Sequence, residues 1–143
     1  MAWADDYSGI PFAWNGRDRS GLDCFGLVRL IFLEQLGIEL PAYSDVPASE
    51  SPLVLQVMVK QSGDRPWSEV SLTELKAFDI VRMSGHYRDS RGRLQRGPIH
   101  VACAIDAEKI IHIEEGREVM VMPITHMLVA KRIVAVHRHE ALA

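Results

Sequence analysis

The hydrophobic pattern in the first third of the chain predicts one buried helix. From Asp23 to Leu36 the sequence reads DCFGLVRLIFLEQL, and its apolar residues fall on nearly every side of a helix. Asp23 is a residue type that favours the N-cap position, Gly37 stands where a glycine stop is expected, and Pro41 forbids continuation. We therefore predict a helix over residues 23–36 that is buried on most of its surface.

The rest of the chain predicts one more helix, one helical turn and a series of strands. The second helix is expected over 49–61, where Ser and Pro precede an apolar stretch that leads to Gly63. Ser71 and Glu74 have capping-box spacing, which predicts a single turn over 71–76. Apolar runs of strand length follow, and they cover 78–83, 99–105, 110–113, 119–122 and 133–137.

The order of these elements predicts an α+β fold. The gaps between the strands are too short for helical crossovers, so we expect helices followed by a mostly antiparallel sheet. No repeat or linker divides the sequence, and residues 1–143 are therefore expected to form a single domain. The segment 84–97 is basic and contains glycine, and we expect a hairpin tip that stands in solvent. Its arginines are Arg88, Arg91, Arg93 and Arg96.

Composition and charge exclude several classes of protein. Hydrophobic residues make up 48% of the chain and charged residues 24%, which is enough for a core and gives no sign of disorder. The formal charge of -3 provides no positive field that would attract nucleic acid. The N-terminus does not resemble a secretory signal, and no apolar stretch reaches the ~20 residues that cross a bilayer. We expect neither nucleic-acid binding nor membrane insertion.

The two cysteines are too few for a disulfide framework and form no CxxC pair. Cys24 stands in the first turn of the predicted helix, where amide groups and the helix dipole favour a thiolate and lower the pKa of a thiol. Gly21 and Gly26 flank Cys24 and would let a substrate approach. These features favour a nucleophile, and the alternative is a small core residue. Cys103 is expected to be a core thiol.

Two histidines are the candidate partners of a Cys24 nucleophile. A thiol nucleophile needs an imidazole to accept its proton and a further group to orient that imidazole. His100 begins one predicted strand, and His112 lies in the next. A three-residue loop over 106–108 would place His112 opposite Ala102, with the two imidazoles about 7 Å apart. The alternative for His112 is a buried core histidine.

The small side chains beside His100 suggest where the predicted helix packs. His100, Ala102 and Ala104 share one face of their strand. Such a face suits close packing, so we expect the helix that carries Cys24 to lie there. The opposite face is expected to hold Val101, Cys103 and Ile105. The remaining histidines are weaker candidates, and most of them are expected at the surface: His86, His126, His137 and His139.

With these residues in view, the chain resembles the NlpC-type cysteine endopeptidases of the cell wall. Residues 9–41, GIPFAWNGRDRSGLDCFGLVRLIFLEQLGIELP, are similar to the family's glycine, proline and aromatic segment followed by an Asp-Cys-x-Gly-Leu helix start. FDIVRM at 78–83 resembles the strand before the histidine motif, and PIHVACAID at 98–106 resembles the histidine strand. The GRDRSGLDC variant, the compact form and the missing export signal look most like the versions carried in phage tails and phage-derived particles.

The resemblance implies a minimal papain-like fold and a role for each matched residue. Cys24 would attack a peptide carbonyl, His100 would act as general base and acid, and His112 would orient the ring of His100. The expected substrate is the bond between γ-D-glutamate and a diamino acid in peptidoglycan stem peptides, with no metal or cofactor. The expected partners are phage tail or tail-tip proteins. The expected location is a virion or phage-like particle tail, after synthesis in the cytoplasm.

Aromatic residues stand where the family usually has other side chains. Phe12 replaces a common tyrosine, Phe25 replaces the serine after the cysteine, and Phe78 replaces a small residue before Asp79. Phe12, Asp23 and Phe25 are the positions expected to contact substrate. The replacements leave the candidate catalytic residues in place and change the expected lining of the substrate groove.

Other functions remain open on the sequence alone. The chain would also suit a structural tail adaptor or plug that keeps the peptidase fold with little or no turnover. Acyl transfer or amidase chemistry would use the same nucleophile through an acyl-enzyme. A zinc site made by Cys24, His100 and His112 is a further alternative, although their spacing matches no usual ligand pattern.

Overall fold

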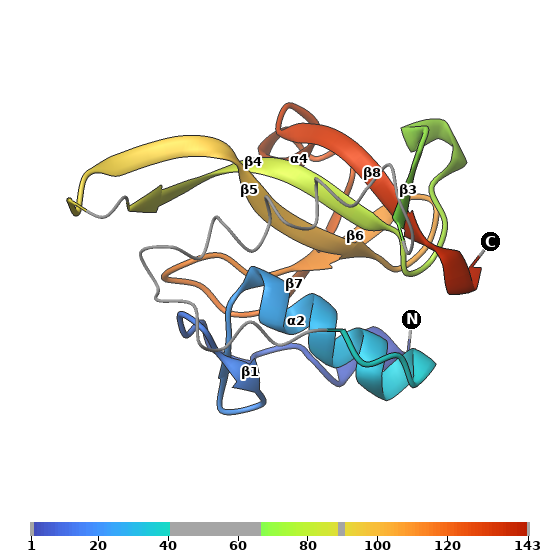
Figure 1. Ribbon diagram of the computed structural model, residues 1–143, viewed down its shortest axis with the longest axis horizontal. Helices are drawn as coiled ribbons and strands as arrows, with labels where there is room; N and C mark the ends of the chain where they lie inside the picture. The colour runs from blue at the N-terminus through green and yellow to red at the C-terminus, as the bar shows by residue number, and fades with distance from the viewer. Residues whose placement is uncertain (1, 41–66, 89–90, 143) are drawn as a thin grey trace.

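An antiparallel six-stranded sheet forms the centre of the computed structural model, which describes residues 2–40, 67–88 and 91–142 (Figure 1). The strand order is β3-β8-β4-β5-β6-β7, and every neighbouring pair is antiparallel. The strands are β3 (Trp67–Val70), β4 (Ile80–Arg88), β5 (Leu94–Ala104), β6 (Lys109–His112), β7 (Met120–Pro123) and β8 (Ile133–His139). The predicted α+β class with a mostly antiparallel sheet is confirmed.

The predicted buried helix is present with both of its end signals. It consists of α2 (Cys24–Ile31) and a π-helical turn, η1 (Phe32–Leu36). The side chain of Asp23 accepts a hydrogen bond from the amide of Gly26, which makes Asp23 the N-cap. Gly37 ends the helix with φ of 67°, in the left-handed region that glycine adopts without strain.

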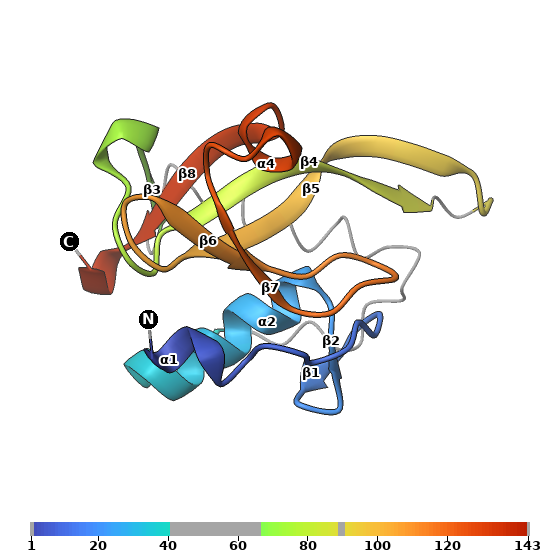
Figure 2. The same cartoon turned by 180° about the vertical axis from the view of Figure 1, so that it is seen from behind.

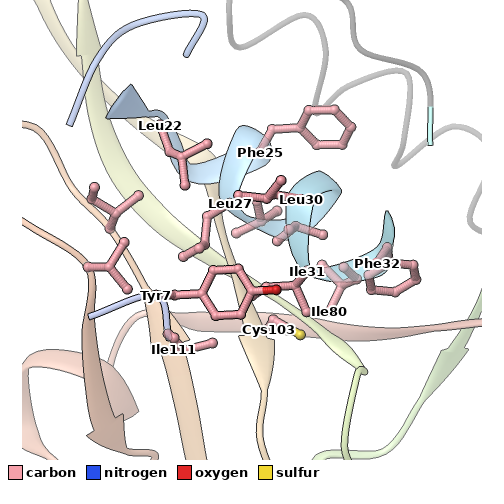
Figure 3. Packing of buried hydrophobic residues seen from close by; sticks show 14 of the residues in the cluster. Tyr7, Leu22, Phe25, Leu27, Leu30, Ile31, Phe32, Ile80, Cys103 and Ile111 are labelled. Carbon is pink, nitrogen blue, oxygen red and sulfur yellow. The ribbon is translucent and has the colours of Figure 1, made fainter. Parts of the chain in front are cut away.

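The helix α2 packs on the opposite face of β5 from the one we expected. The core around Leu27 and Ile31 includes Cys103 and Ile111, and Figure 3 shows these sheet residues on the side that faces the helix. Val101 and Ile105 belong to the same core, whereas Ala102 and Ala104 pack with α4 (Met127–Ala130). Larger side chains bury more apolar area against a helix, which outweighs the closer approach that small residues allow. The sheet thus lies between α2 and α4 (Figure 2).

The strands β4 and β5 form a hairpin that is longer than the sequence predicts. Their pairing runs from Ile80 opposite Cys103 to Arg88 opposite Leu94, with a register shift between Met83 and Gly85. The hairpin extends past the rest of the sheet (Figure 1), so most of the segment 84–97 is paired strand. The expected solvent-exposed tip is confirmed in part, because these side chains are exposed: Arg91, Arg93 and Arg96.

The other predicted elements match with shifted ends. The turn expected over 71–76 is a short 3-10 helix, η4 (Leu72–Glu74), and the helix expected over 49–61 lies outside the described residues. The strand expected from 78 begins at Ile80, because Phe78 has φ of 71° and leaves the extended conformation. The sequence reasoning missed short elements: α1 (Ala2–Asp5), β1 (Arg17–Asp18), β2 (Gly21–Leu22), β3, α4 and η5 (Glu140–Leu142).

Among the described residues, no helix combines the length and the apolar character that a membrane span requires.

Candidate functional site

The start of α2 is fixed to the loop that precedes it. One carboxylate oxygen of Asp23 accepts hydrogen bonds from the Gly26 amide at 2.7 Å and from Arg17 Nη1 at 2.8 Å. The other oxygen accepts from the Asn15 amide at 3.0 Å. A Cβ atom at Gly26 would lie 2.0 Å from the carbonyl oxygen of Gly16, so only glycine fits there. These contacts hold Cys24, the first residue of α2, in one position.

The sulfur of Cys24 lies against β5, at the residue that follows His100. Burial, with a smaller contribution from the charge of Asp23, raises the pKa of the Cys24 thiol to about 12. The amides of Val101 and Phe25 hydrogen-bond to the sulfur and act in the opposite direction. The expected lowering of the pKa by the helix start is therefore wrong for the resting protein, because desolvation of the thiolate outweighs the amides.

The rings of His100 and His112 are in direct contact. The strands β5 and β6 pair with Cys103 opposite Ile111 and Ala104 opposite Ile110, which confirms the predicted register that places His112 opposite Ala102. His100 Nε2 lies 2.9 Å from His112 Nδ1, and the ring centroids are 5.1 Å apart. The rings are closer than the backbone spacing indicates because the side chains lean toward each other.

Both histidines of this pair are buried and neutral. His100 is 4% exposed and His112 is 3% exposed. Burial, with a smaller contribution from a charge on His112, lowers the pKa of His100 to about 3. Burial also lowers the pKa of His112, although the nearby Glu114 opposes this. At neutral pH the resting site therefore holds a neutral thiol and two neutral imidazoles.

Glu114 and Arg132 complete the site, and the sequence reasoning missed both. Glu114 Oε1 lies 3.8 Å from His100 Nε2 and 3.7 Å from His112 Nδ1. Arg132 Nη1 donates to the same Glu114 oxygen at 2.5 Å. Glu114 stands two residues after His112, so the alternation of an extended chain was a signal for its position. Arg132 lies in the turn just before β8, and no local sequence signal identifies it.

One group of side-chain atoms in the described part of the chain has metal-ligand spacing. It consists of atoms from His100, His112 and Glu114 that lie within 4.8 Å of one another. The zinc site considered from the sequence used Cys24 in place of Glu114, and Cys24 does not belong to this group. The Arg132 guanidinium on Glu114 opposes a second cation at the same oxygen.

The residues expected to contact substrate differ in exposure. Phe25 is 4% exposed and lies beneath the guanidinium of Arg17, which is 5.5 Å from the ring centroid. Asp23 is 3% exposed, with its oxygens occupied by the contacts given above. Phe12 is half-buried and packs edge-on against Trp14, with ring centroids 4.8 Å apart. Of these three residues, Phe12 is the most exposed.

The remaining cysteine and histidines lie outside the group formed by His100, His112 and Glu114. Cys103 is fully buried, and burial raises the pKa of its thiol far above the ordinary value. His86 and His126 are exposed as expected. The expectation of a surface position is wrong for His137 and His139, which are 6% and 9% exposed. Both lie on β8, which pairs with β3 on one side and β4 on the other and is therefore an interior strand.

Comparison with known proteins identifies relatives across most of the chain. The sequence model of the NlpC/P60 family matches residues 9–138. Protein P54 of Enterococcus faecium is 33% identical over 118 residues, which are 82% of this chain and 18% of that protein. The chain therefore spans less than a fifth of the length of this relative.

Solved structures of similar proteins share the fold. The NlpC/p60 domain of the peptidoglycan hydrolase SagA matches with a TM-score of 0.58 and 24% identity, over 94% of this chain and 92% of that domain. A Staphylococcus aureus protein of the NLP/P60 family, similar to lipoprotein, matches with a TM-score of 0.61 and 19% identity, over 97% of this chain and 39% of its own. A Bacillus cereus NlpC/P60 family protein matches with a TM-score of 0.61 and 22% identity, over 95% of this chain and 37% of its own.

Proposed function

The chain belongs to the NlpC/P60 family, and we propose that it is a cysteine peptidase of peptidoglycan with Cys24 as its nucleophile. The observation that carries this proposal is the position of the Cys24 sulfur against the amide of Val101. Val101 adjoins His100, whose ring contacts that of His112 at 2.9 Å. A thiol, an imidazole base and a second imidazole that orients the first are the groups that peptide cleavage through a thioester requires.

The protonation of the resting site supports general-base catalysis by His100. Its Nδ1 is the ring nitrogen left for the thiol, because Nε2 faces His112. Nδ1 takes the thiol proton as the sulfur attacks the carbonyl carbon, and it then gives this proton to the leaving amine. His100 next takes a proton from the water that attacks the thioester, and this proton returns to the departing sulfur. The partial positive charge at the start of α2 favours the oxyanion of each step.

The substrate we propose is the bond between γ-D-glutamate and a diamino acid in a peptidoglycan stem peptide. The resemblance to the NlpC-type endopeptidases supports this bond, and the related SagA is described as a peptidoglycan hydrolase. We also propose that the chain works in the tail of a virion or phage-like particle, in contact with tail or tail-tip proteins. The GRDRSGLDC form of the nucleophile segment supports this location.

One observation favours a second candidate function. The pKa of Cys24 is raised to about 12 by burial, which makes the thiolate scarce at neutral pH. A structural tail adaptor or plug that keeps the fold with little turnover would tolerate such a thiol. Acyl transfer uses the same residues as peptide cleavage, and only the products distinguish the two reactions.

The cleavage of a defined peptide tests the proposal. We would incubate the protein with stem peptides that contain γ-D-glutamyl-diaminopimelate and analyse the products by mass spectrometry. We expect hydrolysis at this bond, because Cys24 and His100 can form and resolve a thioester. The Cys24→Ala variant should show no hydrolysis, whereas Cys103→Ala should retain it, because Cys103 lies in the core.

Two results would contradict the peptidase proposal. Hydrolysis by Cys24→Ala at the wild-type rate would assign the nucleophile to another residue. No product from folded wild-type protein, presented alone and in the assembled particle, would support the adaptor function. A product that joins the acyl group to an added amine would instead indicate acyl transfer.

A further inference from the structure

A carboxylate lies where the rings of His100 and His112 meet. Glu114 Oε1 is at nearly equal distances from His100 Nε2 and His112 Nδ1, 3.8 and 3.7 Å. We infer that Glu114, fixed by Arg132, is a positioning residue that holds the histidine pair in the tautomer in which His100 can accept the Cys24 proton. Its catalytic meaning rests on the proposed function, whereas the tautomer is a property of the resting protein.

The contacts of His112 determine where the ring protons lie. His112 Nε2 is 3.3 Å from Met122 Sδ, and Nδ1 of the same ring faces His100 Nε2. A thioether sulfur is a weak acceptor and donates nothing, so a neutral His112 places its proton on Nε2 toward Met122. Nδ1 of His112 then accepts a hydrogen bond from the Nε2–H of His100. This leaves a lone pair on His100 Nδ1, which is the tautomer that a general base for Cys24 needs.

Glu114 favours this arrangement because its negative charge lies beside the shared proton. With the His112 proton on Nε2 toward Met122, a proton on His100 Nδ1 would leave two ring lone pairs directed at the carboxylate oxygen, which a carboxylate disfavours. When His100 takes a proton from Cys24, its ring becomes positively charged in a buried position. The carboxylate at 3.8 Å then offsets part of the cost of that charge.

Arg132 fixes the position of the Glu114 carboxylate. Its Nη1 donates to Glu114 Oε1 at 2.5 Å, and its Nε donates to the carbonyl oxygen of Ser84 at 2.9 Å. The amide of Ser84 in turn donates to the carbonyl oxygen of Arg132 at 2.8 Å. Nη1 also donates to the carbonyl oxygen of Leu128 at 3.3 Å. A guanidinium held by β4 and α4 leaves Glu114 little freedom to turn away from the histidines.

The charged groups around the pair act in opposite directions. Burial raises the pKa of Glu114, but the hydrogen bond and charge of Arg132, together with the interactions with His100 and His112, outweigh it, so the net pKa is lowered and the carboxylate is ionised at neutral pH. Glu114 raises the pKa of both histidines. Arg132 lowers the pKa of both, and Arg117 lowers that of His112. Among the charged groups that act on His100 and His112, Glu114 is the one that favours a positive charge on their rings.

Ring spectra and kinetics of matched variants test this inference. We would compare wild type with Glu114→Gln, which keeps the shape and removes the charge, and with Glu114→Asp, which keeps the charge. Glu118→Gln is the control, because it makes the same chemical change at an exposed position four residues away. Long-range ¹⁵N–¹H spectra of the imidazoles report the tautomer, and cleavage of the stem peptide gives kcat and KM.

We expect the charge of Glu114 to matter for both readouts. Glu114→Gln should show mixed ring tautomers. Its kcat should be about tenfold lower at unchanged KM, because a tenfold change corresponds to the loss of an interaction that shifts the pKa of His100 by about one unit. Glu114→Asp should keep a single tautomer with intermediate kcat, and Glu118→Gln should match wild type.

The spectra separate this inference from the proposed function. If wild-type protein cleaves no peptide, the proposed function fails, and the tautomers of wild type and Glu114→Gln still decide the role of Glu114. Identical ring spectra in these two proteins would overturn the inference. It would also be overturned if micromolar Zn²⁺ shifted the ring signals of wild type but not of Glu114→Gln, because the three residues would then be metal ligands.

Discussion

At the scale of single residues, burial controls the protonation of Cys24 and His100. The helix start and the amides of Val101 and Phe25 favour a thiolate, but desolvation outweighs them and raises the pKa of Cys24 to about 12. The same effect lowers the pKa of His100 to about 3. A thiolate–imidazolium pair would require the opposite pKa order for these groups. The Cys24 sulfur therefore keeps its proton in the resting protein, and the proposed reaction would move this proton to His100 during attack.

Alkylation of the native protein tests this proton position. We expect iodoacetamide to modify Cys24, which is half-buried, and to modify Cys103 only after unfolding, because Cys103 is fully buried. The rate at Cys24 should rise about tenfold for each pH unit between pH 6 and 8, because the thiolate fraction rises by this factor far below the pKa. Peptide mapping by mass spectrometry gives both rates. A constant rate over this range would indicate a preformed thiolate instead.

At the scale of elements, the position of Cys24 depends on contact between α2 and the loop before it. The carbonyl of Gly16 approaches Gly26 so closely that no side chain fits between them. The ion pair of Arg17 with Asp23, at 2.8 Å, keeps the loop and the helix start together. Cys24 is thus placed by backbone packing as well as by the helix itself.

Substitution of Gly26 measures this packing. Alanine in a helix is ordinarily more stable than glycine by about 1 kcal/mol. We expect Gly26→Ala to destabilise the protein by about 2 kcal/mol instead, because the added Cβ meets fixed backbone. Urea unfolding gives this difference in free energy. Gly37→Ala is the comparison, since it adds a Cβ in open space at positive φ and should cost about 1 kcal/mol. A stabilised Gly26→Ala would show that the loop yields.

The sequence predicted correctly those elements whose signals lie within the element itself or in a short connection. The helix over 23–36 has a cap, a stop and apolar residues within its own length, and the register of β5 with β6 follows from a short connection. The face of the sheet on which α2 packs depends on residues far apart in the chain. The small side chains of Ala102 and Ala104 therefore predicted the wrong face. The contact of Arg132 with Glu114 likewise joins residues that are far apart, 18 positions along the chain. Pairings between distant segments leave no periodic pattern in either segment.

At the scale of the whole molecule, the sheet carries buried histidines on both of its faces. His100 and His112 lie with the core that contains Met122, whereas His139 packs against Phe32 and Trp67 near the helix side. Arg82 Nε donates to His137 Nε2 at 3.3 Å. Burial lowers the pKa of each of these histidines. Folding therefore competes with protonation at several sites together.

This competition makes the stability of the fold depend on pH. A histidine whose pKa is lowered on folding binds more protons in the unfolded chain, so its contribution to stability is present above its ordinary pKa of 6.5 and is lost as pH falls below it. For His100, with a pKa of about 3 in the folded protein, the loss approaches about 1.4 kcal/mol per pH unit between 6.5 and 3. We expect the urea midpoint to be lower at pH 5.5 than at pH 7.5.

A substitution away from the candidate site separates the histidine effect from other acid effects. His139→Phe removes one titrating ring from an aromatic cluster with Phe32 and Trp67, so it should reduce the loss of stability between pH 7.5 and 5.5. His86→Phe changes an exposed histidine and should leave the loss unchanged. Urea unfolding of the three proteins at both pH values gives the comparison. Equal losses in wild type and His139→Phe would assign the acid sensitivity to groups other than this buried ring.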